Sequence, residues 1–475
     1  MKTLFRSLLL SLVVLTASAQ LKRELHILSI NDPHAAIECF PRLGFVADSL
    51  RALYPDLLIL SAGDNRSGDP INDMFEIPAY PMVALMNQVG FHATAVGNHE
   101  FDSNQDGLAR LIGLSTFSTL CANMTPDPKW KMHVKPYQVF DCGGISVGVL
   151  GITALGSMGT PESHPARLVD IAFSDPFATI QQYKFLRERC DVVLLLSHLG
   201  YTDDVKFSAE LPWVDMIVGG HSHTQLDGGE LHNGILITQN GKSIPYATHS
   251  TLVLDGSKIV EKRAERIAVK GMPGENKVIA EMLRYFSENP AFKRVLAVAE
   301  TPFDDKEELG CMACEAYIAE SGADLSYQNA GGVRIENHAA GDIVVGDVMK
   351  MDPFQNDLVE LSVTGKELSE MLISCYDNDK QRFPYVGGMT CEIVTNPADG
   401  KIKKLTLFDK DGKKLNLKKT YRVVSNSYSV AVSPTNRKDE GHSLGITTPD
   451  IIKNYLEHQG RVSYQGRRCL KFVDK

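Results

Sequence analysis

The chain has 475 residues, of which 43% are apolar and 23% are charged, and it carries a formal net charge of −9. These are ordinary values for a globular protein, and the length exceeds that of one compact core, so we expect two domains. The acidic balance excludes a broad basic surface for polymeric nucleic acid, although a positive pocket inside a cleft remains open.

Residues 1–19 have the layout of a cleavable export signal. Two basic residues, Lys2 and Arg6, precede a Leu- and Val-rich core that ends in an Ala-Ser-Ala sequence before Gln20. This core is too short for a permanent membrane span. No cysteine follows the cleavage site to carry a lipid, and the C-terminus lacks a hydrophobic tail. We therefore expect a periplasmic or secreted protein without a membrane anchor, as a monomer or a dimer.

Between residues 20 and 270, short β-rich apolar runs alternate with amphipathic helical patterns. Five runs stop at polar clusters, which are NDPH (31–34), GD (63–64), GNHE (97–100), SH (197–198) and GGHSH (219–223). Buried parallel strands are such continuous Val, Ile and Leu runs, and open α/β sheets bind ligands beyond the carboxyl ends of their strands. The pattern predicts an α/β domain that gathers these polar side chains in one place.

The clusters contain side chains that commonly ligate transition metals. They are Asp32, His34, Asp64, Asn98, His198, His221 and His223. Imidazole and carboxylate together suit Zn, Mn, Co, Fe or Ni rather than Ca or Mg, and the two oxygens of Asp64 can bridge two ions. Two such ions clamp phosphoryl oxygens and generate hydroxide near neutral pH. Each cluster alone is common in loops, but their joint occurrence favours a dinuclear centre for phosphoester hydrolysis.

Residues 271–293 are predicted to form a linker helix that Pro273 opens. Residues 294–475 then mix helical stretches with strands, which predicts an α+β second domain. Its Cys311 and Cys314 form a C-x-x-C in a helical segment. A redox pair or half of a zinc site is conceivable, but buried thiols are favoured because no second C-x-x-C and no thioredoxin-like pattern accompany it.

These motifs resemble, in the same order, the signature of the calcineurin-like metallophosphoesterases, in the branch of 5'-nucleotidases and UDP-sugar hydrolases. In the second domain, QNAGGVR (328–334), the segment GDIVVGDVMKMDPFQNDLVELSVTGKEL (341–368) and FPYVGGM (383–389) resemble that branch's nucleotide-binding domain. The resemblance covers nearly all of the chain after residue 20. It implies a metallophosphoesterase α/β sandwich, layered α/β/β/α, over residues 20–270 and an α+β substrate-binding domain over residues 294–475.

The resemblance also implies roles for single residues. One ion would be held by Asp32, His34, Asp64 and His223, and the other by Asp64, Asn98, His198 and His221. Within GNHEFD, His99 and Asp102 resemble the catalytic pair. The imidazole of His99 would act on the phosphoryl group or the leaving oxygen, and Asp102 would orient it.

For the substrate, the resemblance implies that Arg334 reaches the phosphate with Asn329 nearby, while Phe383 and Tyr428 sandwich the base. An arginine fork suits phosphate, and an aromatic ring stacks on any base. The sequence departs from the family where Gly-Gly-Asp-Gly usually follows the second aromatic, since residues 425–443 read SNSYSVAVSPTNRKDEGHS.

The expected reaction is removal of the 5'-phosphate from nucleoside monophosphates, giving nucleoside and inorganic phosphate. Within enzymes, a UDP-sugar hydrolase or a 2',3'-cyclic nucleotide phosphodiesterase with 3'-nucleotidase activity is an alternative. A nucleotide-binding surface protein without catalysis is a third reading. A structural metalloprotein is disfavoured, because structural sites are usually closed by Cys and His.

Overall fold

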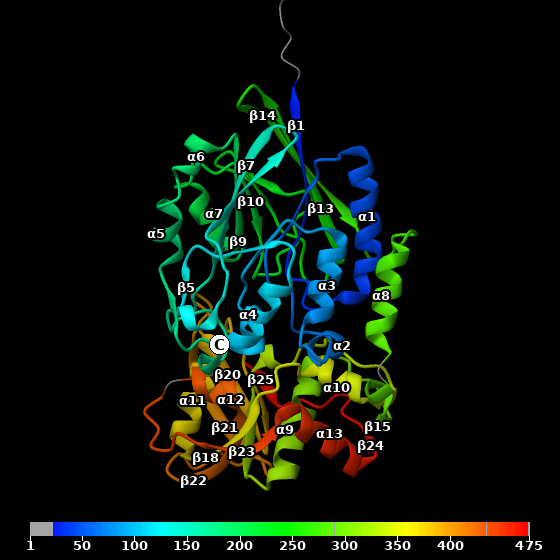
Figure 1. Cartoon of the computed structure of the whole chain (residues 1–475). Helices are drawn as coiled ribbons and strands as arrows, with labels where there is room; N and C mark the ends of the chain where they lie inside the picture. Colours follow the sequence, from blue (N-terminus) through cyan, green and yellow to red (C-terminus); the bar gives the residue numbers. More distant parts are fainter. Residues whose placement is uncertain (1–21, 289, 434, 474–475) are drawn as a thin grey trace, which may run out of the picture.

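The computed structural model describes residues 22–288, 290–433 and 435–473, so the expected export signal at residues 1–19 lies outside the described residues. Figure 1 shows two bodies stacked end to end, with the N-terminal body in blue to green above and the C-terminal body in light green to red below. No helix in the described part of the chain is long and apolar enough to cross a membrane.

The N-terminal body is built on two mixed sheets. The first has the order β14-β13-β1-β2-β3-β4, and its strands are β1 (Arg23–Ile30), β2 (Leu58–Ser61), β3 (Ala93–Ala95), β4 (Ser118–Leu120), β13 (Tyr246–Asp255) and β14 (Lys258–Ala268). The second has the order β11-β12-β10-β9-β7-β6, and its strands are β6 (Tyr137–Cys142), β7 (Ile145–Thr153), β9 (Val192–His198), β10 (Met216–Gly219), β11 (Glu230–His232) and β12 (Ile235–Thr238). A small pair joins β5 (Met124–Pro126) to β8 (Ile171–Phe173).

Helices cover the outer faces of both sheets. They are α1 (Phe40–Leu53), α2 (Pro70–Asp73), α3 (Tyr80–Val89), α4 (Asn104–Leu114), α5 (Pro176–Gln181), α6 (Leu186–Arg189), α7 (Tyr201–Ser208) and α8 (Lys277–Ser287). Alternate residues of β1 point to opposite faces. Leu25 and Ile27 pack between the two sheets, whereas Leu28 and Ile30 pack under α1, α3 and α8. The expected α/β/β/α sandwich is confirmed.

The helix predicted after the first domain is α8. It begins at Lys277 and not at Pro273, because Asn276 caps it by accepting the N–H of Ile279. It packs against the N-terminal body, where Ile279 and Phe286 join the core under α1 and α3. Figure 1 shows α8 beside α1 at the edge of that body, and the chain passes from its lower end into the C-terminal body.

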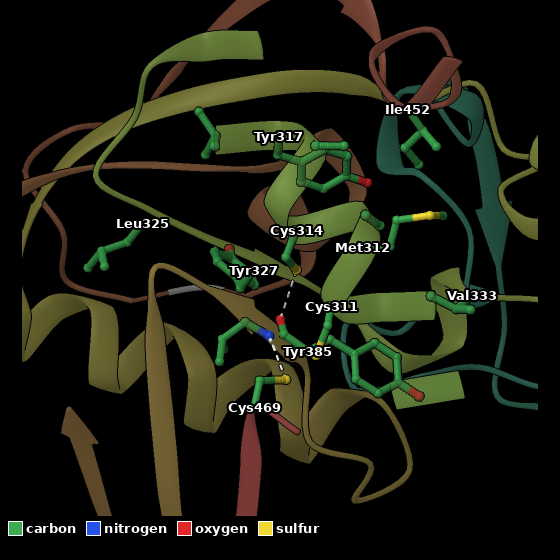
Figure 2. Packing of buried hydrophobic residues seen from close by; sticks show 14 of the residues in the cluster. Cys311, Met312, Cys314, Tyr317, Leu325, Tyr327, Val333, Tyr385, Ile452 and Cys469 are labelled. Atoms are coloured by element: carbon green, nitrogen blue, oxygen red, sulfur yellow. Dashed lines mark hydrogen bonds between the residues drawn. The ribbon is translucent and has the colours of Figure 1, made fainter. Parts of the chain in front are cut away.

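The C-terminal body is α+β, as predicted. Its strands are β15 (Val295–Ala299), β16 (Leu325–Gln328), β17 (Gly341–Val344), β18 (Asp357–Thr364), β19 (Tyr385–Gly387), β20 (Met389–Thr395), β21 (Ile402–Asp409), β22 (Thr420–Asn426), β23 (His442–Thr447), β24 (Arg461–Val462) and β25 (Leu470–Phe472). Its helices are α9 (Lys306–Ser321), α10 (Val345–Met351), α11 (Gly365–Asn378), α12 (Ser427–Val432) and α13 (Thr448–Gln459). A sheet of order β19-β16-β22-β18-β23 lies at its centre. The buried helix α9 packs on it through residues such as Tyr317 (Figure 2).

Candidate functional site

The five predicted polar clusters lie at the C-terminal ends of β1, β2, β3, β9 and β10 or in the loops that follow, so both sheets of the sandwich contribute to the site. The backbone in these loops is unusual, because several of the polar residues have positive φ: Asp32, His34, Asp64, His221 and His223, with φ between 46° and 72°. Non-glycine residues rarely adopt this region, and such strain concentrates at functional sites. The sharp turns direct the side chains toward one another.

The first group of side chains surrounds His34 at the end of β1. Ligand atoms of Asp32, His34 and His223 all lie within 4.8 Å of one another. The Nε2 atoms of His34 and His223 are 2.9 Å apart, and His223 Nε2 is 3.5 Å from Asp32 Oδ1. Asp64 Oδ2 is 3.8 Å from His34 Nε2. This group is the set expected to hold one ion.

The second group surrounds His198 at the end of β9. Its Nε2 atom is 3.2 Å from Asp64 Oδ2, while its Nδ1 atom contacts the Ala62 carbonyl oxygen at 2.7 Å. Asn98 Oδ1 lies 3.1 Å from His221 Nδ1. Asp64 thus borders both groups, as a bridging carboxylate must.

The chemistry of these donors fits a metal centre. The Nε2 atom of His198 is buried and faces Asp64 Oδ2 at 3.2 Å. Burial opposes its charged form, but the Asp64 carboxylate raises the pKa of His198 to about 10, so this imidazole must release a proton when it binds an ion. Burial lowers the pKa of His223 to about 3 and holds the pKa of His34 well below its usual value, with the charge of Arg334 adding to both effects. Neutral imidazoles have a lone pair to donate, which metal binding requires.

Two residues lock the ligand loops together. The buried carboxylate of Glu100 accepts N–H groups from Asp64 at 3.0 Å, Asn65 at 2.8 Å and Gly97 at 2.6 Å. Gly97 allows close contact, because a Cβ there would lie 2.3 Å from Asp64 Oδ1 and 2.8 Å from His198 Nε2. Sequence reasoning noticed the GNHE motif but gave no role to Glu100 or Gly97.

His99 and Asp102 lie together on the short 3-10 helix His99–Ser103, with His99 Nδ1 2.8 Å from Asp102 Oδ2. Asp102 also accepts hydrogen bonds from Ser67 Oγ and from Arg167 Nη1, the latter at 2.8 Å. The other end of the Arg167 guanidinium donates to the Phe354 carbonyl oxygen of the C-terminal body at 2.8 Å. Sequence reasoning missed Arg167, which connects the His99–Asp102 pair to the second body.

The two bodies border a cleft whose empty space, open solvent included, is about 620 Å³. The N-terminal body contributes Asn98, His99, Asp102 and Arg167 to its lining, and the C-terminal body contributes Asn329, Arg334, Phe354, Asp379 and Tyr428. The partly buried Arg334 guanidinium reaches from the C-terminal body to the N-terminal body, since its Nη2 atom lies 3.2 Å from His34 Nδ1. Asn329 Oδ1 accepts from Asn426 Nδ2 and Ser429 Oγ, which fixes its position at the cleft wall.

The predicted aromatic pair is not brought together. Tyr428 lines the cleft, but Phe383 is only 3% exposed and packs in the hydrophobic core beside Tyr376. The second cleft aromatic of the C-terminal body, beside Tyr428, is Phe354, whose ring stacks on His99 with 5.7 Å between the ring centroids and lies under Arg334. The expectation for Phe383 is therefore corrected, because tertiary packing buries its ring away from the cleft.

Comparison with known protein families matches both bodies. Residues 25–225 match the family described as calcineurin-like phosphoesterase, and residues 286–433 match the family described as 5'-nucleotidase, C-terminal domain.

Curated relatives match along most of the chain, and a solved structure shares its fold. The chain is 27% identical to a 5'-nucleotidase of Vibrio cholerae over 469 residues, which cover 84% of this chain and 82% of the relative. It is also 27% identical to Protein UshA of Yersinia enterocolitica, with 84% and 83% covered. The crystal structure of a 5'-nucleotidase precursor from Thermus thermophilus has the same fold, with a TM-score of 0.83 at 23% identity, over 95% of this chain and 100% of that one.

Proposed function

We propose that the protein removes the 5'-phosphate of nucleoside monophosphates. The chain belongs to the calcineurin-like phosphoesterases with a 5'-nucleotidase C-terminal domain, and it is a metal-dependent phosphoric ester hydrolase. The products are a nucleoside and inorganic phosphate. One observation supports this most strongly: the Arg334 guanidinium, which lines the cleft, lies 3.2 Å from Nδ1 of His34, a candidate ligand with strained backbone. A phosphate held there would contact both.

The family implies divalent metal ions, and the proposal assigns two of them to named ligands. Asp32, His34, Asp64 and His223 would hold one, and Asp64, Asn98, His198 and His221 the other, with Zn, Mn, Co, Fe or Ni as candidates. When bound, such a pair supplies Lewis acidity and a hydroxide near neutral pH. The support for this assignment is the donor set itself, in which the buried Nε2 atom of His198 faces Asp64 Oδ2 at 3.2 Å.

The remaining steps belong to protein side chains. Arg334 presents a planar fork to the phosphate oxygens and stabilises their negative charge. His99 Nδ1 is engaged by Asp102 at 2.8 Å, so Nε2 is the atom left to face the substrate. A proton on this Nε2 passes to the ester oxygen as the phosphorus–oxygen bond breaks, and the nucleoside leaves as an alcohol.

Arg167 makes this arrangement depend on the closed cleft. Its guanidinium binds Asp102 and the carbonyl oxygen of Phe354 at the same time. If the bodies separate, the contact with Phe354 is lost and Asp102 loses part of its support. We therefore expect cleft opening about the region of residues 271–293 to weaken the orientation of His99, which couples domain closure to catalysis.

The base would stack on the aromatic rings of the C-terminal body that line the cleft, Phe354 and Tyr428. After Tyr428 the chain folds back on itself, because Arg437 donates to the carbonyl oxygens of Val430 and Ser433. No acidic residue of this segment lines the cleft. The carboxylate that the C-terminal body does supply is Asp379, which accepts the N–H of Gly331 at 2.7 Å.

Because the loop after Tyr428 lacks the Gly-Gly-Asp-Gly of the family, hydrolysis of UDP-sugars or of 2',3'-cyclic nucleotides is a second candidate function. A phosphate-release panel distinguishes the candidates. The purified chain is stripped with a chelator, reloaded with Mn or Zn, and given nucleoside monophosphates, cyclic nucleotides and UDP-glucose. The proposal requires phosphate from 5'-monophosphates only after metal is returned. Preferred turnover of UDP-glucose or of cyclic nucleotides would select the second candidate, and no turnover of any of them would remove the enzymatic reading.

We also propose that the protein acts outside the cytoplasm as a periplasmic or secreted enzyme, supported by the sequence of residues 1–19. N-terminal sequencing of the protein from its native compartment should begin near Gln20. Retention of Met1 on the active protein would contradict export through a cleaved signal.

A further inference from the structure

Two cysteine side chains lie close together where the segment before β25 contacts helix α9. Strand β25 adds to β20 in parallel register, which places Cys469 directly before the pairing of Cys391 with Leu470. The Sγ atoms of Cys469 and Cys311 and a carboxylate oxygen of Glu307 all lie within 4.8 Å of one another. Figure 2 shows Cys469 beneath α9, next to Cys311.

The neighbouring thiol of the C-x-x-C has a different partner. Cys314 Sγ donates to the Tyr385 carbonyl oxygen at 3.4 Å, and Cys469 Sγ accepts the N–H of Val386 at 3.5 Å (Figure 2). The C-x-x-C is therefore not paired within itself. Cys311 faces Cys469, which is distant in sequence and only 5% exposed.

We propose that Cys311 and Cys469 form a disulfide bond that fastens the C-terminal strand to α9. The structure holds both as buried thiols whose sulfur atoms lie within 4.8 Å of each other. This inference is independent of the catalytic proposal, but it needs an oxidising compartment, which export supplies.

A metal ion is the competing occupant of this cluster, and the surroundings disfavour it. Glu307 Oε1 already accepts N–H groups from Cys469 at 2.8 Å and Leu470 at 2.9 Å. The Arg468 Nε atom lies 3.9 Å from Glu307 Oε2, so this carboxylate already has a positive charge beside it. A covalent link needs neither a free carboxylate nor a charge.

The bond would form by exchange with a disulfide of a thiol oxidant, such as oxidised glutathione or a dithiol oxidoreductase. Cys311 and Cys469 each give up a proton, their sulfur atoms join, and the two electrons reduce the oxidant's disulfide to two thiols. In the folded protein both thiols are buried, and contact with Cys469 together with burial raises the pKa of Cys311. We therefore expect the thiol–disulfide exchange to take place during folding, before β25 pairs with β20.

Because the bond would close a loop through most of the C-terminal body, it should restrict the unfolded chain strongly. We expect the oxidised protein to melt on the order of 5–10 °C above the reduced one.

The test uses the full chain, folded with oxidised glutathione, denatured without reductant and titrated for thiols. The proposal predicts two fewer free thiols than the nine in the sequence, and a cross-linked pair of peptides containing Cys311 and Cys469 in mass spectrometry. Nine free thiols, or cross-links of either cysteine to Cys314 or Cys391, would overturn it. One zinc ion bound per wild-type chain and absent from Cys311→Ser would also overturn the proposal.

Variants give a second, independent readout. Cys311→Ser and Cys469→Ser should each melt at the temperature of the reduced wild-type protein and become insensitive to reductant. Cys190→Ser, a buried cysteine of the N-terminal body, is the matched control and should keep the reductant-sensitive shift. Equal reductant sensitivity of Cys311→Ser and wild type would contradict the bond. The peptide map of the wild-type protein decides the question if the variants do not fold.

Discussion

Gly97→Ala tests how tightly the proposed ligands are packed. The new Cβ would lie 2.3 Å from Asp64 Oδ1 and 2.8 Å from His198 Nε2, where ordinary contacts begin at 3.4 Å. The Asp64 carboxylate must therefore retreat by about 1 Å, whereas ligand distances in metal sites hold to about 0.2 Å. Displacing a catalytic group by about 1 Å costs about 100-fold in rate. The φ of Gly97 is not positive, so backbone strain adds nothing to this effect.

The assay is kcat/KM for adenosine 5'-monophosphate at saturating Mn, together with metal content by mass spectrometry and the melting temperature. We expect a loss of about 100-fold, equivalent to about 2.7 kcal/mol. Gly113→Ala in α4 is the matched control, because a Cβ there meets nothing within 4 Å, and it should retain full activity. Wild-type turnover and two bound metals in Gly97→Ala would refute the packing of Asp64 against His198 as the basis of the site.

Three further substitutions probe the cleft. His99→Asn should lower kcat by roughly 10²- to 10⁴-fold while both metals stay bound, as measured by metal content; loss of one metal would make His99 a ligand. Arg167→Gln removes a hydrogen bond to the charged Asp102 and should reduce kcat by roughly 10- to 100-fold with little change in KM; an effect confined to KM would contradict its positioning role. Tyr428→Leu should raise KM for the nucleotide by roughly 5- to 100-fold and spare hydrolysis of 4-nitrophenyl phosphate, whereas Phe383→Leu, in the core, should not discriminate between the two substrates. Equal effects on both substrates in Tyr428→Leu would remove the stacking role.

The sequence predicted the architecture of the N-terminal domain because its signals are local. A continuous apolar run before a polar cluster indicates a buried strand and its end, and each of the five runs is a strand in the structure. Packing of Leu25 toward one face of β1 and Leu28 toward the other follows from the same alternation. The gathering of the polar clusters then follows from sheet topology.

The C-terminal half of the cleft was harder to predict, because an aromatic residue gives the same sequence signal in a core as in a cleft. Phe383 and Phe354 both lie in loops near strands, and only the packing of the whole domain buries one and exposes the other to the cleft. Arg167 was missed for a related reason. Its role depends on Asp102 and on a carbonyl oxygen from a distant segment, so no local pattern marks it.

The charge networks around the ligands also lay beyond sequence reasoning. Glu100 is the last residue of the GNHE motif, yet its carboxylate accepts the N–H groups of Asp64, Asn65 and Gly97 and is not left free to bind a metal. Only the three-dimensional register of the loops after β2 and β3 distinguishes a supporting carboxylate from a ligand.

The most direct measurement is anomalous diffraction from crystals soaked in Mn. The account predicts two peaks several ångströms apart with Asp64 between them, one beside His34 and His223 and the other beside His198 and His221. A single peak away from Asp64, or no peak at saturating Mn in crystals of active protein, would contradict the dinuclear centre.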